Sequence, residues 1–284
     1  MHEIQAKSIL SAYNGINVYR GCTHGCIYCD ARSLCYHTPV PFEDIEVKIN
    51  APELLDAALR HKKKQCMIGT GSMSDPYIPL EQKLCITKKC LEVIEKHGFG
   101  LAIQTKSDLI LRDEQLLCSI NKKAKCVVQI TLTTYDENLC KIIEPCVCTT
   151  ERRIAVLERM RTLGIPTVVW ISPVLPFIND NMENIRHILE ACARCNVKGI
   201  IAFGMGLTLR DGNREHFYAA LDRHFPGMKE RYIKEFGCAY ELPSRNTAQL
   251  TAYFHSFCKE HDILHTPESC FAYMKDFSPQ LSLF

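Results

Sequence analysis

The amino-acid sequence predicts an α/β fold, a partial (β/α)6 barrel with a C-terminal helical appendage. Two observations carry this prediction. Short apolar runs rich in β-branched residues alternate with amphipathic segments as far as Phe203, which is typical of parallel βαβ units. From Thr208 onward the alternation stops and helical patterns dominate. Six βαβ units are too few for a closed eight-stranded barrel, so an open doubly wound sheet is the alternative.

Six apolar runs are short enough to be buried parallel strands. They are Ile16–Tyr19, Cys66–Gly69, Gly100–Thr105, Cys126–Leu132, Pro166–Ile171 and Gly199–Phe203. The helical patterns between them are Ala51–His61, Leu80–His97, Asp113–Cys118, Thr150–Leu163 and Met182–Cys195. The helical patterns after them are Glu215–His224, Met228–Phe236, Asn246–His261 and Pro267–Lys275. We therefore expect a barrel over 1–207, a helical extension over 208–276 and a flexible tail over 277–284, with the chemistry at the carboxyl ends of the strands.

Composition is that of an ordinary globular protein. The 284 residues are 46% hydrophobic and 23% charged, which excludes a disordered or collagen-like chain. A net charge of +2 does not indicate a strongly basic nucleic-acid binder. The N-terminus is polar and no run approaches the ~20 apolar residues of a membrane span, so we expect a cytoplasmic protein with no membrane partner. Two basic runs, Arg60–Lys64 and Lys122–Lys125, precede strands and are expected to be solvated loops at the opposite end from the site.

The strongest motif is a group of three cysteines, Cys22, Cys26 and Cys29, with the spacing C-x3-C-x2-C. It follows the first predicted strand, so it lies in the first βα loop. Thiolates favour iron–sulfur clusters or zinc. Three ligands on a four-iron cluster leave one iron open for a reactant, whereas the alternative is a zinc site completed by His24, Cys35 or His37. The other 14 of the 17 cysteines are mostly expected to be reduced, buried apolar side chains.

This motif after the first strand of a partial barrel resembles the radical SAM superfamily, with its TIM-like partial barrel. The resemblance to the spore photoproduct lyase family within it extends over several segments in the same order. They are residues 17–32, 69–77 followed by Glu81, 104–107, 143–145 with Arg153, and 173–176. The resemblance implies a [4Fe–4S] cluster on the three cysteines, and reductive cleavage of S-adenosylmethionine to a 5′-deoxyadenosyl radical.

The resemblance also implies which residues hold S-adenosylmethionine. Gly71, with the hydroxyl of Ser72 or Ser74, is expected at the methionyl amine, after the second strand. Lys106 is expected to reach the ribose or the carboxylate, because an ammonium group offers three donors. Thr131 matches a serine of the family that contacts S-adenosylmethionine, and Tyr28 is expected beside the adenine.

One departure separates this sequence from spore photoproduct lyase proper. Those enzymes carry a cysteine before the Ser-Asp pair of the second-strand loop, and its thiol returns a hydrogen atom to the product. Here Ser72 occupies the equivalent position, and a hydroxyl is a far poorer hydrogen-atom donor. We therefore expect a different substrate, with Cys140, Cys146 and Cys148 as candidate donors.

The sequence leads to a radical enzyme of a lyase-like family, acting on DNA or another nucleic acid. Radical modification of a peptide or small metabolite is the first alternative, and a non-enzymatic iron–sulfur redox protein is the second. The expected partners are S-adenosylmethionine, an electron donor such as flavodoxin or ferredoxin, and DNA. Gln280–Phe284 resembles the peptide by which bacterial proteins bind the sliding clamp.

Overall fold

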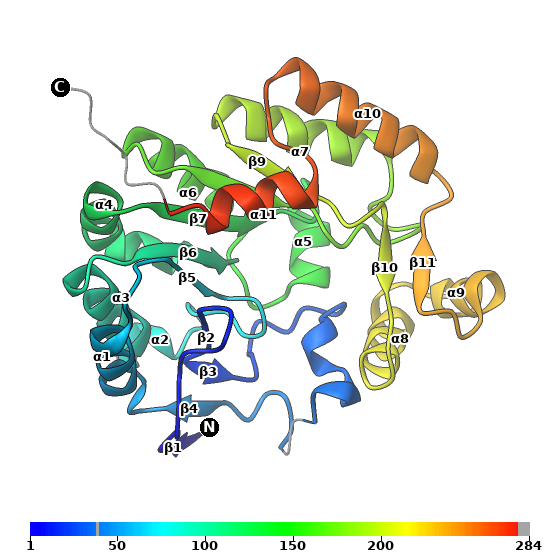
Figure 1. Cartoon of the computed structure of the whole chain (residues 1–284). Helices are drawn as coiled ribbons and strands as arrows, with labels where there is room; N and C mark the ends of the chain where they lie inside the picture. The colour runs from blue at the N-terminus through cyan, green and yellow to red at the C-terminus, as the bar shows by residue number, and fades with distance from the viewer. Residues whose placement is uncertain (38–39, 278–284) are drawn as a thin grey trace.

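A six-stranded parallel sheet forms the centre of the molecule (Figure 1). A computed structural model describes residues 1–37 and 40–277. In order across the sheet, the strands are β2 (Gly15–Ile16), β5 (Met67–Thr70), β6 (Gly100–Thr105), β7 (Cys126–Thr131), β8 (Thr167–Trp170) and β9 (Gly199–Ile201). Strands β2 and β9 are its two edges, so the barrel is open on one side. The predicted partial (β/α)6 barrel is confirmed.

Helices cover the outer face of this sheet, and further helices follow in the C-terminal part of the chain. The barrel helices are α1 (Ala51–His61), α2 (Glu81–Leu84), α3 (Ile86–Lys96), α4 (Glu114–Lys123), α5 (Glu137–Ile143), α6 (Thr150–Thr162) and α7 (Met182–Arg194). The later helices are α8 (Asn213–His224), α9 (Met228–Phe236), α10 (Thr247–Glu260) and α11 (Pro267–Lys275). Three 3-10 helices span Asp30–Arg32, Leu34–Tyr36 and Asp108–Asp113. The predicted Leu80–His97 helix is divided in two, because Cys85 between α2 and α3 adopts a left-handed conformation with φ 53°.

The first predicted strand, Ile16–Tyr19, is wrong as a single element. Only β2 pairs with the main sheet, through β5. The chain then leaves the sheet, and β3 (Tyr19–Arg20) pairs antiparallel with β4 (Glu46–Lys48). Strand β1 (His2–Ile4) lies on the other side of β4. This three-stranded sheet carries the cysteine loop, which starts directly after β3.

The main core lies between the sheet and its outer helices. Strand residues that point outward, such as Leu101, Ile103, Val128 and Val169, are fully or almost fully buried against the helical layer. Because the inner face is covered as well, by side chains of α11, both faces of the strands are buried and the strands read as nearly continuous apolar runs. The same core includes Leu250 and other side chains of α10.

The concave side of the sheet is closed at its amino-terminal end by α11. Inward-facing side chains from five strands pack against this helix; they are Met67, Ala102, Val127, Val168 and Ile201, and they contact Cys270 and Met274 of α11. Figure 1 shows α11 lying across the strands rather than outside the helical layer. The C-terminal helical appendage is therefore confirmed, with the addition that one of its helices fills part of the barrel.

Lys125, just before β7, anchors this helix. Its Nζ donates to the main-chain carbonyls of Tyr273 at 2.6 Å and Asp276 at 3.1 Å, and it lies 3.8 Å from the centroid of the Tyr273 ring. The prediction of a solvated loop for Lys122–Lys125 is thus wrong for Lys125, which is buried.

A two-stranded antiparallel sheet after β9, the β10–β11 sheet, was not predicted. Strands β10 (Gly206–Thr208) and β11 (Glu241–Pro243) pair antiparallel, with α8 and α9 between them in the chain. Leu207 and Leu242 bury one face of the β10–β11 sheet in a second core with Tyr28 and Phe217. This sheet thereby forms a wall beside the cysteine loop.

No helix in the described ranges is long and apolar enough to cross a membrane. The predicted clamp-binding segment Gln280–Phe284 lies outside the described residues. The last described residue, Phe277, packs beside Gly100 at the start of β6.

Candidate active site at the carboxyl ends of the strands

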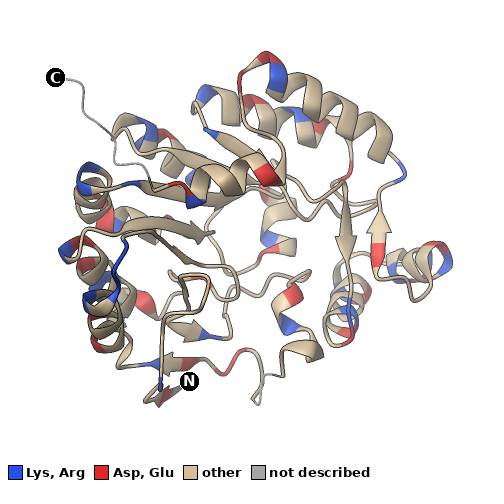
Figure 2. Cartoon of the chain, in the orientation of Figure 1, with Lys and Arg blue, Asp and Glu red and all other residues tan. Residues whose placement is uncertain are grey.

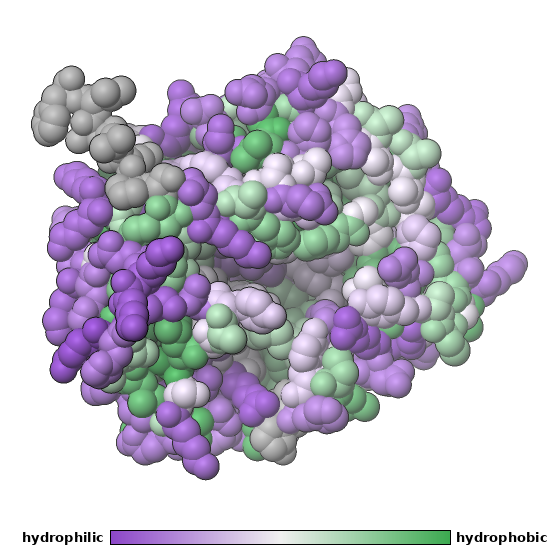
Figure 3. Space-filling model, viewed as in Figure 1, coloured by the Kyte–Doolittle hydropathy of each residue, from purple (hydrophilic) through white to green (hydrophobic). Residues whose placement is uncertain are grey.

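A cavity of about 520 Å³ lies at the carboxyl ends of the parallel strands. It is lined by the cysteine loop, the ends of β5 to β8, the segment after β9 and the β10–β11 sheet. Figure 3 shows the molecule hollowed at the centre of this face, with weakly polar and apolar residues around the opening. The position agrees with the expectation that the chemistry lies at this end of the barrel.

The three motif cysteines all line this cavity. Cys26 is buried, and Cys22 and Cys29 are half-buried. Burial raises the pKa of the Cys22 thiol to about 12, and it raises the pKa of Cys26 and of Cys29 as well. The thiols are therefore neutral until a metal cation displaces their protons.

Glycine at the start of the loop is required by close packing. A Cβ at Gly21 would lie 2.4 Å from the carbonyl oxygen of Phe42, and its φ is +85°. Ser74 holds the same point, because its hydroxyl donates to the Gly21 carbonyl at 2.5 Å. Ser74 also lines the cavity in which the sequence predicted an ammonium group.

A buried ionic cluster ties the loop to the fourth βα unit. The hydroxyl of Tyr28 donates to Glu144, and Arg153 pairs with Glu144 at 2.5 Å. Arg153 also donates to the carbonyl of Thr131 at 2.8 Å. Nearby, the amide of Ile27 donates to the carbonyl of Ile143 at 3.0 Å. We call Tyr28, Glu144 and Arg153 the clasp; it fixes the cysteine loop relative to the end of β7.

The second-strand loop is held to the third strand by Asp75. This carboxylate accepts from the Thr105 hydroxyl and from the Lys106 amide, both at 2.7 Å. Gly71 touches the third strand directly, because a Cβ there would lie 2.1 Å from the carbonyl oxygen of Gln104. With φ +100°, Gly71 brings bare backbone to the cavity wall. Ser72 is exposed beside it and also lines the cavity.

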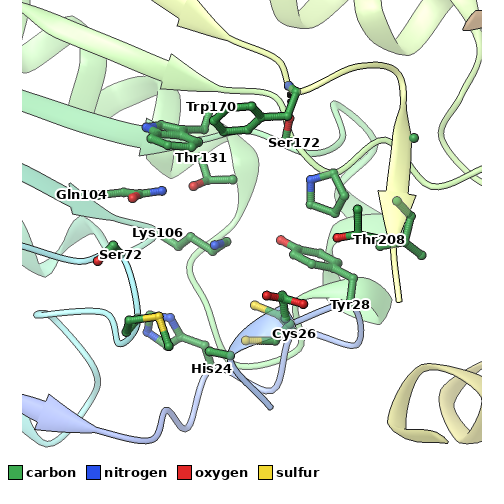
Figure 4. Close-up of a pocket in the computed structure, with 18 of the residues that line it drawn as sticks. His24, Cys26, Tyr28, Ser72, Gln104, Lys106, Thr131, Trp170, Ser172 and Thr208 are labelled. Carbon is green, nitrogen blue, oxygen red and sulfur yellow. Dashed lines mark hydrogen bonds between the residues drawn. The ribbon is translucent and has the colours of Figure 1, made fainter. Parts of the chain in front are cut away.

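Lys106 points into the space between the cysteine loop and β7 (Figure 4). Its Nζ lies 5.9 Å from the centroid of the Tyr28 ring. Burial disfavours the charge, but the carboxylates Glu144 and Asp75, together with Cys26 once its thiol is deprotonated, outweigh burial and raise the pKa of Lys106. Lys106 thus supplies a permanent positive charge in the cavity.

Thr131, the last residue of β7, presents a polar atom to the same space. It is buried, it lines the cavity, and its Oγ1 has no hydrogen-bond partner among the residues that the structure describes. A buried hydroxyl without a partner is costly. The cavity therefore has an open polar position beside Lys106.

The three candidate hydrogen donors do not line this cavity. Cys140 is buried behind the clasp, with its Sγ 3.0 Å from Arg153. Cys146 is exposed and Cys148 is half-buried, and both line a separate cavity of about 530 Å³. His24 belongs to the walls of both cavities. A donor role for these thiols stays a prediction.

Of the ligands suggested for the zinc alternative, His24 lines the cavity beside the cysteines, whereas Cys35 and His37 are exposed. Cys35 is exposed, and its Sγ accepts from Arg210 at 3.3 Å. Across residues 1–37 and 40–277, no three His, Cys, Asp or Glu side chains are grouped so as to hold a single metal ion.

Sequence reasoning missed one wall of the cavity. This wall is formed by Trp170 and Ser172 at the end of β8, Phe203 after β9, and Thr208 and Glu241 of the β10–β11 sheet. The inward position of Trp170 at a strand end could have indicated this wall. No local pattern indicates the β10–β11 sheet, whose strands have three residues each.

A family model described as the radical SAM superfamily matches residues 16–192. The chain is 28% identical over 257 residues to an uncharacterized protein of Mycobacterium tuberculosis (strain ATCC 25618 / H37Rv), covering 85% of this chain and 75% of the relative. It is 36% identical over 179 residues to an uncharacterized protein of Methanocaldococcus jannaschii, covering 62% of this chain and 66% of the relative. A solved structure of spore photoproduct lyase complexed with dinucleoside spore photoproduct matches with a TM-score of 0.63 at 13% identity, covering 89% of this chain and 75% of that one.

Proposed function

The chain belongs to the radical SAM superfamily, which uses a [4Fe–4S] cluster and S-adenosylmethionine, and from this premise we propose that it generates a 5′-deoxyadenosyl radical to act on a nucleic-acid substrate. One observation carries the proposal. Cys22, Cys26 and Cys29 face a cavity that also holds the half-buried cation Lys106 and the hydroxyl of Thr131, which has no partner among the described residues.

The residues present fit both groups. Three thiols and no fourth cysteine on the same wall suit a cluster with one open iron. Lys106 and Thr131 offer a cation and a hydroxyl to the carboxylate and ribose of S-adenosylmethionine, and Gly71 offers backbone to its amine. When bound, the reduced cluster and S-adenosylmethionine supply the radical.

The chain itself binds, orients and encloses. The clasp holds the cysteine loop against β7, so the thiols keep a fixed position relative to Lys106 and Thr131. Asp75 fixes the main chain at Lys106, and Tyr28 lies on the same side of the cavity as Cys26 (Figure 4). Preorganised groups of this kind cost no rearrangement when the reaction starts.

A nucleic-acid substrate is supported by analogy with the lyase that shares this fold. The outer surface gives no independent support, because Lys and Arg are interspersed with Asp and Glu over the outer helices (Figure 2). A tether through Gln280–Phe284 to the sliding clamp would provide proximity to DNA without a basic face. The last described residue, Phe277, lies beside Gly100 at the amino-terminal end of β6, and Gln280–Phe284 lies outside the described residues.

The reaction is expected to differ from that of spore photoproduct lyase. Ser72 lines the cavity where a donor thiol would be needed, and Cys140, Cys146 and Cys148 lie elsewhere. We expect little repair of dinucleoside spore photoproduct by this protein.

The test is anaerobic reconstitution with iron and sulfide, followed by S-adenosylmethionine and dithionite. The wild-type protein should show the absorbance of one [4Fe–4S] cluster and release 5′-deoxyadenosine, faster with an oligonucleotide substrate. Cys22→Ala, Cys26→Ala and Cys29→Ala should each lose the cluster, whereas Cys238→Ala, at an exposed cysteine outside the cavity, should keep it. Zinc in place of iron, or no 5′-deoxyadenosine, would refute the radical function.

Lys106→Ala separates the cofactor from the cluster. Because Lys106 contributes no ligand atom to the cluster, this variant should keep the cluster absorbance and bind S-adenosylmethionine more weakly. Equilibrium dialysis with labelled S-adenosylmethionine measures the change, and an unaltered affinity would remove Lys106 from the site.

A further inference from the structure

Two aromatic rings form the side of the cavity away from the cysteines. Trp170 is the last residue of β8, and Phe203 lies two residues after β9. The two strands are parallel neighbours, with Trp170 paired to Ile201. The ring centroids are 5.7 Å apart with an interplanar angle of 50°. Figure 4 shows Trp170 across the cavity from Cys26. We call the wall formed by Trp170, Ser172 and Phe203 the ring end.

The rings are fixed in place. The indole Nε1 of Trp170 donates to Oε1 of Gln129 at 2.9 Å. The amide of Phe203 donates to Oγ of Ser172 at 3.1 Å. Phe271 of α11 packs behind both rings, at 5.9 Å from Trp170 and 6.1 Å from Phe203. Rings held in this way lose little conformational entropy when a ligand binds.

Phe203 is nevertheless 61% exposed. A single exposed apolar side chain on a convex surface requires no explanation. This ring, however, lines a cavity beside a second aromatic ring. Two adjacent rings with open faces offer a surface on which a third ring can stack.

The ring end carries no charge. The cavity residues contributed there by the segments after β8 and β9 are Trp170, Ser172, Pro173, Phe203, Gly204 and Met205. The hydroxyl of Ser172 accepts from Phe203, and among the described residues its own proton has no acceptor. The charged groups that line the cavity come from other segments: Asp30 from the cysteine loop, Asp75 and Lys106 from the loops after β5 and β6, and Glu241 from β11. This wall therefore favours an uncharged ligand that is flat and has a hydrogen-bond acceptor at its edge.

We propose that the ring end is a subsite for an uncharged aromatic ring of the substrate, which stacks on Trp170 and Phe203 and accepts a hydrogen bond from Ser172. The subsite rests on the proposed function in one respect, that the ring it holds belongs to the molecule on which the radical acts. A nucleobase and the phenol ring of tyrosine share this chemistry, because each is flat and uncharged and carries an acceptor oxygen at its edge, and the experiment below distinguishes them.

The chain contains one tryptophan, Trp170, so its emission reports on the ring end alone. The cluster-loaded protein with bound S-adenosylmethionine is titrated anaerobically with thymidine, with N-acetyltyrosinamide and with N-acetylleucinamide, using excitation that selects tryptophan. The first two should change the emission saturably, and the leucine derivative should not. The tighter of the two ring probes identifies the source of the ring.

Variants of Phe203 test the stacking directly. Phe203→Leu keeps the apolar bulk and removes the ring, so ring-probe affinity should fall about three- to tenfold. Phe203→Tyr should keep wild-type affinity. Tyr13→Leu, at a tyrosine that is 95% exposed and outside the cavity, is the matched control and should also keep it.

Three results would overturn the subsite. They are equal affinity in Phe203→Leu and wild type, equal binding of the leucine derivative, and full competition by the adenine of S-adenosylmethionine. Release of 5′-deoxyadenosine is measured on the same wild-type preparation. If the radical forms but the ring probes do not change the Trp170 emission, only the subsite fails. If ring probes bind but no 5′-deoxyadenosine forms, the proposed function fails, and with it the assignment of the bound ring to a radical substrate, while the ring end still binds aromatic rings.

Discussion

The clasp makes a sharp prediction about stability. Arg153 is 0% exposed and Glu144 is its ionic partner at 2.5 Å. Glu144→Gln keeps the size and shape of the side chain but removes the negative charge. The guanidinium then remains buried, with the Thr131 carbonyl as a neutral acceptor. Removing one partner of a buried pair costs about 3–5 kcal/mol, because the other charge is left uncompensated.

This cost converts into a measurable fall in melting temperature. A chain of this length loses about 2 °C per kcal/mol, near the lower end of the range for large domains. The unfolding midpoint of Glu144→Gln should therefore lie roughly 6–10 °C below that of the wild type. Circular dichroism of the reduced, cluster-free protein under anaerobic conditions measures it, because metal binding then adds nothing to stability.

The matched control is a more exposed ion pair that joins α4 to α6. Glu114 accepts two hydrogen bonds from Arg159, at 2.7 and 2.6 Å, but both groups are open to solvent. Glu114→Gln should change the midpoint only slightly, since solvent screens such a pair. If Glu144→Gln shifts the midpoint no more than Glu114→Gln does, the clasp does not hold the fold as argued.

The same pair predicts the sign of a pH dependence. Burial alone would raise the pKa of Glu144, but Arg153 and Lys106 lower it below its usual value. A lowered carboxyl pKa gives stability that is complete above the unfolded value of about 4.3 and is lost as the pH falls toward the folded value. Wild type and Glu144→Gln should therefore differ most near neutral pH and converge in acid. A difference that grows in acid would contradict this assignment.

Three further substitutions test other contacts. Gly71→Ala places a Cβ 2.1 Å from the Gln104 carbonyl at φ +100°, so strain of about 1–3 kcal/mol should lower the urea midpoint, and an unchanged midpoint would show that the loop yields freely. Lys125→Met leaves two carbonyls near the end of α11 without their buried donor. Hydrogen exchange of the α11 amides should therefore accelerate about tenfold or more. Exchange as slow as in the wild type would show that Lys125 does not anchor this helix. Tyr28→Phe removes the hydroxyl bound to Glu144 and should cost about 1 kcal/mol while the cluster absorbance persists, whereas loss of the cluster would give Tyr28 a larger role.

The barrel could be predicted because its signals are local. Gly100–Thr105 and Cys126–Thr131 are short, largely apolar runs that are buried on both faces, so periodicity and length suffice. The first strand failed because β3 pairs with β4 rather than with the main sheet, and pairing partners distant in sequence leave no local mark. Helix α5 was missed, although Asp136 caps it by accepting from the amides of Asn138 and Leu139, which is a readable start signal.

The residues of the candidate site also differ in whether a local motif could indicate them. The cysteines, Gly71 and Lys106 belong to short motifs, and the structure brings all of them to one cavity. Trp170 and Phe203 belong to no motif, and only the register of β8 and β9 brings them together. Spacing indicated Cys140 as near the catalytic face, but a side chain on the inner side of α5 contacts the clasp instead.

The position of α11 inside the barrel has a consequence for synthesis on the ribosome. All six strands of the sheet emerge before α11 does, so the apolar floor of the barrel is exposed to water until that helix arrives. The floor consists of Met67, Ala102, Val127, Val168 and Ile201. During this interval the nascent chain presents an adhesive concave surface to other chains and to chaperones. Substitutions that delay the docking of α11 would therefore reduce the yield of soluble protein, even where the finished molecule is as stable as before.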